Sequence, residues 1–383
     1  MSVTYPAGFE AAGVIGGLKS SGARDIAVVR NIGPQDVAAG VFTSNRFQAA
    51  PVLWSRQVVS DGRLRAVVLN SGGANACTGP DGFADTHATA ERAAELLGVD
   101  AGDVAVCSTG LIGVRLPMDR LLTGLAQACR ELSPNGGEDA ALAIMTTDTV
   151  PKTVALGVGE YAIGGMAKGA GMLAPALATM LVVITTDAVL TPADAATALR
   201  SATSATFDRL DSDGCMSTND TVLLLASGAS GHAPDPGDFT AALTQACGSL
   251  AEQLMSDAEG ASKDIVIDVR GALREEEAVD VARAVARSNL LKCAVHGADP
   301  NWGRVLAAMG TTSAAFDPQA VDVAMNGVWV CRGGAVGDDR ALVDLSGRRV
   351  VIEINLNAGS ASAQVLTNDL TARYVHENSA YAT

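Results

Sequence analysis

The sequence predicts a mixed α/β fold in which packed sheets are covered by helices. Short apolar runs rich in β-branched residues, which are typical of strands, alternate with longer segments whose apolar residues recur at helical spacing. The chain shows neither a regular strand–helix–strand repeat nor a Gly-x-Gly-x-x-Gly stretch. These observations favour a layered sandwich of sheets and helices over a doubly wound parallel sheet.

Strand and helix patterns alternate in the first part of the chain. Over residues 83–97 the apolar residues share one face of a helix, and Gly98 suits the position that follows a helix C-terminus. Pro117 suits a first helical position, with an apolar stripe after it. The predicted elements are β structure within 1–60, a strand over 66–69, the helix over 83–97, a strand over 103–106, a helix from 117 to 132, a loop over 133–137 and a short strand over 153–156.

The second part of the chain continues this mixture. The apolar run over 180–184 predicts a buried strand, and Thr191 is a good N-cap for the helix that follows. Polar residues over 211–221 predict a long loop that is structural or supports a site, and the Pro- and Gly-rich stretch over 228–237 is the clearest linker. Later elements are predicted as a strand over 222–226, a helix over 238–257, a strand over 264–269, a helix over 274–290 and strands within 321–331 and 349–357.

The composition excludes several classes of function. The 383 residues suffice for two domains with a sizeable core, and they carry a net charge of −15 from 27 basic and 42 acidic side chains. This charge would repel nucleic acid, and aromatic residues for base stacking make up only 4% of the chain. We therefore expect the ligand to be a small molecule.

Targeting and metal-binding patterns are missing from the sequence. It contains no apolar run of about 18 residues for a membrane span, and its first residues lack the basic and apolar regions of a signal peptide. Seven cysteines are scattered singly and four histidines form no His-Glu-x-x-His stretch, which favours reduced thiols in a cytoplasmic protein without a zinc site. A Ser-His-Asp triad stays open as an alternative, because its members need not be close in sequence.

The most informative stretch runs from Gly164 to the predicted strand at 180–184. It holds four glycines around Lys168, which permits a tightly folded loop over residues 164–172. Thr179 then stands where this loop meets a buried strand, a good place for a nucleophilic hydroxyl. A phosphate-binding loop would need Gly-Lys followed by Ser or Thr, but here Lys168 precedes Gly169. A purely structural turn is the other interpretation.

Several motifs resemble those of the ornithine acetyltransferases, also called glutamate N-acetyltransferases. Lys-Gly-Ala-Gly-Met at 168–172, followed by a proline and by Ala-Thr-Met-Leu at 178–181, is similar to the self-cleavage site of this family. The resemblance extends to Glu-Gly-Ala-Ser-Lys at 259–263 and Asp-Pro-Asn-Trp-Gly-Arg at 299–304, and it covers nearly the whole chain. One departure is Ala176-Leu177, where many members carry Asn-Met, which makes this loop less polar.

The resemblance implies an αββα sandwich, as in this family and in the self-cleaving aminopeptidases, that cuts itself between Ala178 and Thr179. Residues 1–178 would form an α fragment and residues 179–383 a β fragment, assembled as an α2β2 heterotetramer. The Thr179 hydroxyl would attack the Ala178 carbonyl, and water would then release the two fragments. Cleavage would free the α-amine of Thr179, and an ordinary α-amine has a reference pKa of about 8. This amine can accept the proton of the Thr179 hydroxyl, so that no catalytic histidine is needed.

The resemblance also assigns site residues. A strand that ends in Ser-Thr-Gly at 108–110 offers backbone N–H groups, and the family places its oxyanion hole at Thr109 and Gly110, through the threonine hydroxyl or a backbone amide. Without the resemblance, these residues would be assigned to a strand–helix turn. Lys168 is expected to pair with the substrate carboxylate and Glu259 with the ornithine amine. The full set of implied substrate contacts is Thr146, Lys168, Thr179, Glu259, Asn378 and Thr383.

The implied activity is that of a glutamate N-acetyltransferase of arginine biosynthesis. The acetyl group would move from N2-acetylornithine to Thr179 and then to glutamate, with ping-pong kinetics and with no metal or bound cofactor. The sequence leaves open whether acetyl-CoA is a second donor. It also leaves two alternatives: a self-cleaving aminopeptidase or amidohydrolase of similar fold, whose nucleophile is typically serine, and a non-enzymatic binding protein with an uncut chain.

Overall fold

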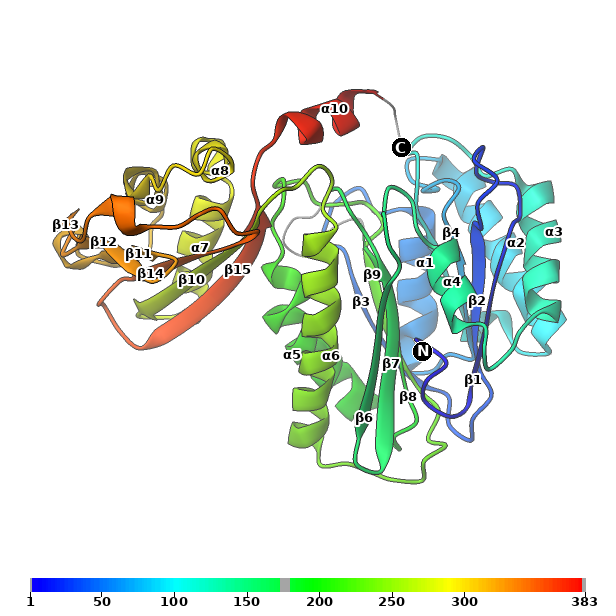
Figure 1. Ribbon diagram of the computed structural model, residues 1–383. Coiled ribbons are helices and arrows are strands. Elements are labelled where there is room, and N and C mark those ends of the chain that lie inside the picture. The colour runs from blue at the N-terminus through cyan, green and yellow to red at the C-terminus, as the bar shows by residue number, and fades with distance from the viewer. Residues whose placement is uncertain (1, 173–179, 381–383) are drawn as a thin grey trace.

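The computed structural model describes residues 2–172 and 180–380 of the chain. Figure 1 shows a larger part that holds two sheets and most of the helices, and a smaller part with a third sheet. The chain passes into the smaller part after α6 (Pro236–Ser256) and leaves it before α10 (Ala372–Ala380). No helix within the described residues is long and apolar enough to cross a membrane.

Two mainly antiparallel sheets form the larger part. The parallel neighbours are β4 (Ala66–Asn70) with β5 (Val104–Ser108) in the first sheet and β8 (Leu181–Thr186) with β9 (Thr221–Ala226) in the second. The first sheet has the order β1 (Phe9–Val14), β2 (Ile26–Asn31), β4 (Ala66–Asn70), β5 (Val104–Ser108). The second has the order β3 (Val37–Phe42), β9 (Thr221–Ala226), β8 (Leu181–Thr186), β7 (Tyr161–Lys168), β6 (Lys152–Val158).

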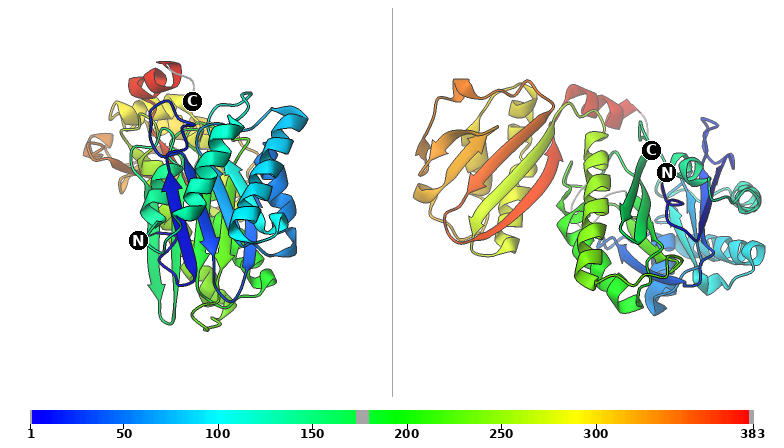
Figure 2. Two further views of the ribbon diagram at one scale, coloured as in Figure 1. Left: turned by 90° about the vertical axis from the view of Figure 1, so that its right-hand side faces the viewer. Right: turned by 60° about the horizontal axis from the view of Figure 1, so that its bottom comes forward.

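The two sheets pack face to face and share one apolar core. Val28 and Val67 of the first sheet belong to the same buried cluster as Val183 and Leu223 of the second. The second sheet packs on its other face against α5 (Pro192–Ala205) and α6, and the first sheet packs against α2 (Gly79–Leu97) and α3 (Met118–Arg130). These layers, which Figure 2 shows from two further sides, confirm the predicted αββα sandwich.

The smaller part has a sheet and a core of its own, which the sequence analysis did not separate from the rest. Its helices are α7 (Glu275–Ala286), α8 (Asn289–His296) and α9 (Trp302–Met309). Helix α7 packs against two strands of this sheet, β10 (Asp264–Ala272) and β15 (Ala361–Asn368). The strand order is β13 (Ala335–Val336), β12 (Val328–Arg332), β11 (Asp322–Met325), β14 (Arg349–Asn355), β10 (Asp264–Ala272), β15 (Ala361–Asn368).

The structure corrects the predicted glycine loop over residues 164–172. Gly164 and Gly165 lie inside β7, paired with both β6 and β8, and Lys168 is the last residue of this strand. Gly164 is needed for packing rather than for a turn, because a Cβ there would lie 2.3 Å from the carbonyl oxygen of Ser2. The connection to β8 therefore begins only at Gly169.

Other local expectations are also wrong. Helix α1 (Ala50–Val58) lies where β structure was expected, and α4 (Gly137–Ala143) follows the predicted loop over 133–137 in a stretch for which no element was predicted. The helix predicted over 274–290 is in fact α7 and the start of α8, because the hydroxyl of Ser288 accepts from the Leu291 N–H and begins a new helix. The stretch over 228–237 connects β9 to α6 within the larger part instead of joining two domains.

Candidate active site

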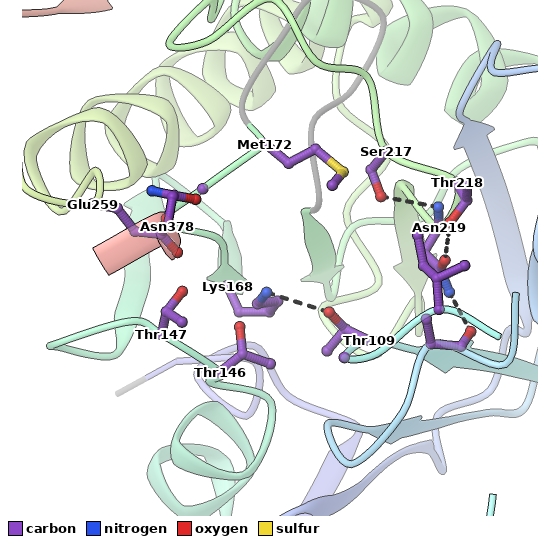
Figure 3. Close-up of a pocket in the computed structure, with 14 residues that line it drawn as sticks. Thr109, Thr146, Thr147, Lys168, Met172, Ser217, Thr218, Asn219, Glu259 and Asn378 are labelled. Carbon is purple, nitrogen blue, oxygen red and sulfur yellow. Dashed lines mark hydrogen bonds between the residues drawn. The ribbon is translucent and has the colours of Figure 1, made fainter. Parts of the chain in front are cut away.

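A cavity of about 120 Å³ opens where several elements of the fold end. Thr109 and Gly110 follow β5, Lys168 ends β7, and Glu259 follows α6. Asn378 on α10 lies beside Glu259, as Figure 3 shows. The cavity therefore gathers side chains from both sides of the Ala178–Thr179 bond, although these side chains are far apart in sequence.

Most of the predicted site residues meet at this cavity. Its lining includes Thr109, Gly110, Thr146, Lys168, Glu259 and Asn378. The other predicted residues, Ala178, Thr179 and Thr383, lie outside the described residues. Met172, the last described residue before Thr179, also lines the cavity.

The hydrogen bonds of Thr109 decide which of its groups can act on a ligand. Its backbone N–H donates to the carbonyl oxygen of Asn70 at 3.0 Å, and its carbonyl accepts from the Gly73 N–H at 3.0 Å. Its hydroxyl accepts a hydrogen bond from Lys168 Nζ at 3.3 Å (Figure 3). A hydroxyl that accepts at its oxygen still has its own hydrogen to donate. The side chain of Thr109, rather than its amide, is therefore the group available to an oxyanion.

Gly110 offers a second donor. Its N–H donates to no acceptor among the described residues, and it lies at the rim of the same cavity. Its φ of +131° is one that favours glycine, and a Cβ would come within 2.8 Å of the Gly73 nitrogen. Two hydrogen-bond donors, the Thr109 side-chain hydroxyl and the Gly110 backbone amide, thus lie next to each other at the end of β5.

Lys168 is fully enclosed, and both burial and the Asp148 carboxylate act on its pKa. Burial lowers the pKa of Lys168, and the Asp148 carboxylate opposes this effect. Burial also raises the pKa of Asp148, but Lys168, Lys152 and the Gly169 N–H outweigh this and bring it to about 2. Asp148 accepts hydrogen bonds from the N–H groups of Gly169 at 2.7 Å and Thr146 at 2.9 Å. The cavity therefore has a buried amine whose pKa is lowered by burial and raised by the ionised carboxylate of Asp148.

Asp148 is part of a larger buried network. Lys152, which is also fully enclosed, donates from Nζ to Asp148 and to Asp257. Asp257 in turn accepts from the backbone and the hydroxyl of Thr149. Removing one partner of such a network leaves an uncompensated buried charge, which is strongly destabilising. Asp148 and Lys152 are thus supports of the site that no short sequence motif indicated.

Glu259 lines the cavity close to Gly171. Its carboxylate makes no ion pair or hydrogen bond with any other described residue, while its backbone N–H donates to the Ala170 carbonyl at 2.8 Å. A Cβ at position 171 would come within 2.6 Å of the carboxyl group. Glycine at this position therefore leaves the space that the Glu259 side chain occupies.

Gly171→Ala is expected to displace the Glu259 carboxylate while the chain stays folded. The clash falls on the end of a flexible side chain, so the melting temperature should change by no more than a few degrees, as is usual for a change below about 1 kcal/mol. The KM for a cationic substrate should rise, because its anionic partner is moved. Thermal unfolding and steady-state kinetics on the same preparation separate the two effects. An unchanged KM would show that Glu259 adjusts without cost.

The loop over 211–221 contributes more to the cavity than its sequence indicated. The side-chain amide of Asn219 donates to the carbonyl oxygens of Ala74 at 2.6 Å and Ser108 at 2.7 Å. Since Ser108 precedes Thr109, Asn219 holds the end of β5 in place from the loop that precedes β9. Ser217 and Thr218 line the cavity next to it. The polar run before an apolar strand was the only signal for these residues.

Comparisons with known proteins agree with the motifs. A profile described as ArgJ family matches residues 10–383. The chain belongs to the ArgJ family. "Arginine biosynthesis bifunctional protein ArgJ" of Streptomyces coelicolor is 64% identical over 382 residues, and the protein of the same name from Thermobifida fusca is 62% identical over 383 residues; each alignment covers 100% of both chains. A solved structure described as ornithine acetyltransferase complexed with ornithine, from Mycobacterium tuberculosis, is 63% identical, covers 45% of this chain and 94% of that chain, and has a TM-score of 0.45.

Membership of the ArgJ family confirms the resemblance that the motifs indicated. The one cluster of serine, histidine and aspartate considered within residues 2–172 and 180–380 does not have the geometry of a triad. Ser262, His296 and Asp369 do meet, where the chain enters and leaves the smaller part. However, Asp369 Oδ2 at 2.8 Å and the Ser262 hydroxyl at 3.2 Å contact the same ring nitrogen, Nδ1 of His296. A triad needs the serine and the aspartate on different ring nitrogens. Among the described residues, no group of three His, Cys, Asp or Glu side chains could hold a metal ion.

Proposed function

We propose that this chain is a glutamate N-acetyltransferase of arginine biosynthesis, which moves the acetyl group of N2-acetylornithine to glutamate through an acetyl ester on Thr179. Full-length identity above 60% to biosynthetic ArgJ proteins supports the class of reaction. The observation that carries the proposal is the cavity itself, where the buried amine of Lys168 and the carboxylate of Glu259, which has no partner among the described residues, lie around the donors of Thr109 and Gly110. An amino acid with a cationic side chain has the complementary charges.

The first step of the proposed mechanism is self-cleavage between residues 1–178 and 179–383. The Oγ atom of Thr179 bonds to the Ala178 carbonyl carbon, the C–N bond breaks, and the hydroxyl proton ends on the departing nitrogen. Water then hydrolyses the ester and releases the Ala178 carboxylate. The product is an N-terminal threonine, whose α-amine serves as the base for its own hydroxyl.

Acetyl transfer then repeats the same chemistry on the substrate. The Thr179 hydroxyl attacks the acetyl carbonyl of N2-acetylornithine, and the Thr109 hydroxyl and the Gly110 amide stabilise the oxyanion. The C–N bond to ornithine breaks and the amine leaves with the proton that the threonine lost. Glutamate enters, its amine attacks the acetyl ester, and N-acetylglutamate leaves. Parallel lines in double-reciprocal plots at several glutamate concentrations would test this ping-pong order.

Donor choice, assembly and compartment are further parts of the proposal. The word "bifunctional" in the names of the relatives supports acetyl-CoA as a second acetyl donor, which an assay without N2-acetylornithine would test. We propose an α2β2 heterotetramer of the two fragments, to be tested by native mass spectrometry. All seven cysteines are unpaired, which supports a reducing, cytosolic location. The identity of the relatives does not favour an aminopeptidase.

Glu259→Gln is expected to raise the KM for N2-acetylornithine by about 10- to 150-fold. The change removes one charge-assisted contact to the substrate δ-amine, of about 1.5–3 kcal/mol, and every 1.4 kcal/mol is about a factor of ten. Self-cleavage should survive, because no substrate takes part in that step. Steady-state kinetics with N2-acetylornithine as the varied substrate measures the KM. A denaturing gel of the same sample measures self-cleavage.

Glu377→Gln is the matched control, because this glutamate on α10 pairs with Arg373 and does not line the cavity. Its KM should stay within about twofold of the wild-type value. A Glu259→Gln protein that binds N2-acetylornithine normally but stays uncut would contradict the assignment, since Glu259 would then act in cleavage.

A further inference from the structure

Asp220 holds Met180, the second residue after the predicted cleavage bond. It directly precedes β9 and is fully buried. Its Oδ1 accepts a hydrogen bond from the Met180 N–H at 3.0 Å. On the other side of the same residue, the N–H of Thr221 donates to the Met180 carbonyl at 3.1 Å. Both backbone polar groups of Met180 are therefore fixed by Asp220 and its chain neighbour.

The second oxygen of Asp220 has no comparable role within the described residues. Oδ2 is enclosed and meets no hydrogen-bond partner there, and the nearby Ser217 hydroxyl does not reach it with hydrogen-bond geometry. The charged groups that act on the carboxyl are Lys168, at the end of β7, and Asp208, in the turn Phe207–Arg209 after α5. Burial raises the pKa of Asp220 well above its usual range, and Lys168 opposes this. A buried polar atom without a partner is costly, so a partner for Oδ2 is to be expected.

The chain itself supplies a candidate for that partner. Nitrogens of consecutive residues are separated by three covalent bonds, and so by no more than about 4 Å. Oδ1 already contacts the nitrogen of Met180, and the preceding nitrogen in the chain is that of Thr179. Cleavage before Thr179 would turn this nitrogen from an amide into an amine that gains and loses a proton.

We propose that Asp220 is a positioning residue for the nucleophile: Oδ1 holds Met180, and Oδ2 pairs with the α-ammonium group that forms when the Thr179 amine takes up the hydroxyl proton. This proposal rests on the proposed self-cleavage and on the amine as base. The Oγ–H bond breaks, its proton goes to the amine nitrogen, and its electron pair forms the bond to the acyl carbon. Asp220 takes no proton in this step. The ammonium then returns the proton to the leaving ornithine nitrogen.

Asp220→Asn tests the proposal, because asparagine keeps the size of the side chain and an acceptor for Met180 but not the negative charge. A nearby carboxylate raises the pKa of an amine, so its loss should lower the pKa of the Thr179 amine. We expect the acidic limb of the kcat profile to move to lower pH by about one unit or more. The plateau of kcat should fall at least about tenfold, and the KM for N2-acetylornithine should stay within about twofold.

Asp208→Asn is the matched control, since it removes the other acid near Asp220 without touching Met180. Its pH profile should superimpose on that of the wild type. An Asp220→Asn profile that also superimposes on the wild type, or a loss of kcat without movement of the acidic limb, would overturn the role of Asp220 alone. A wild-type chain that stays uncut would instead overturn the proposed function.

A second measurement covers an Asp220→Asn chain that does not fold or cut. In the cleaved wild-type enzyme, the pKa of the Thr179 amine can be measured from the pH dependence of its reductive methylation. The proposal predicts a value above that of a threonyl peptide, about 8 for an ordinary α-amine. A value at or below that of the peptide would overturn the pairing with Asp220.

Discussion

Replacing Thr179 by alanine is expected to leave one uncut chain without acetyl transfer. Alanine removes the hydroxyl that attacks the Ala178 carbonyl, and it also removes the atom that would carry the acetyl group. The loss should therefore be complete in both reactions rather than a change of rate. A denaturing gel of the purified protein, next to the wild type, measures cleavage, and an assay of ornithine release measures transfer.

Thr179→Ser is the control for this variant, because it keeps a hydroxyl on the same backbone position. It should retain some cleavage and some transfer. A Thr179→Ala protein that is cut and active would contradict the whole mechanism. A wild-type chain that runs as a single intact band would instead favour the non-enzymatic binding protein that the sequence left open.

Local patterns predicted the layers of the fold but not the positions of all its turns. The apolar runs at 66–69 and 222–226 form β4 and β9 as expected, because buried strands carry their signal within a few residues. The glycines at 164 and 165 led to the wrong prediction of a loop, because a glycine permits a turn but equally permits close packing. The contact that requires Gly164 is the carbonyl oxygen of Ser2, and a contact so distant in sequence leaves no local signal.

The sequence predicted the site residues that belong to family motifs. It did not predict the charged residues that support the site from positions distant in sequence. Thr109 and Lys168 were found through their resemblance to family motifs, and they lie in contact in the structure. Asp148, whose carboxylate raises the pKa of Lys168 against the effect of burial, belongs to none of these family motifs. Its partner Lys152 and the acid Asp257 are separated by more than a hundred positions, so that only the fold could pair them.

These contacts also change what Lys168 is expected to do. The sequence led us to expect that it pairs only with a substrate carboxylate. Its hydrogen bond to the Thr109 hydroxyl gives it a second effect, because a cation at the oxygen orients the hydroxyl hydrogen away from itself and makes it a better donor. If Lys168 binds the substrate carboxylate as proposed, substrate binding and stabilisation of the oxyanion are linked through one buried amine.

Thr109→Ala is accordingly expected to lower kcat by roughly 10²–10³, which is the usual loss when one donor of an oxyanion hole is removed. The backbone N–H of Thr109 already donates to Asn70, so the amide cannot take over the function of the hydroxyl. The KM for N2-acetylornithine should change little, since the hydroxyl acts mainly on the charge that develops in the transition state. Steady-state kinetics on cleaved enzyme gives both values.

Self-cleavage passes through an oxyanion as well, so Thr109→Ala should also be cut more slowly, over hours that a time series of gels would resolve. Thr109→Ser keeps the hydroxyl and should recover most of kcat, whereas Thr147→Ala removes a hydroxyl elsewhere in the cavity lining and should leave kcat within a few-fold of the wild type. If Thr109→Ala keeps its full kcat, the oxyanion is held by the Gly110 amide and other groups alone. Lys168 would then act on the substrate carboxylate and not through Thr109.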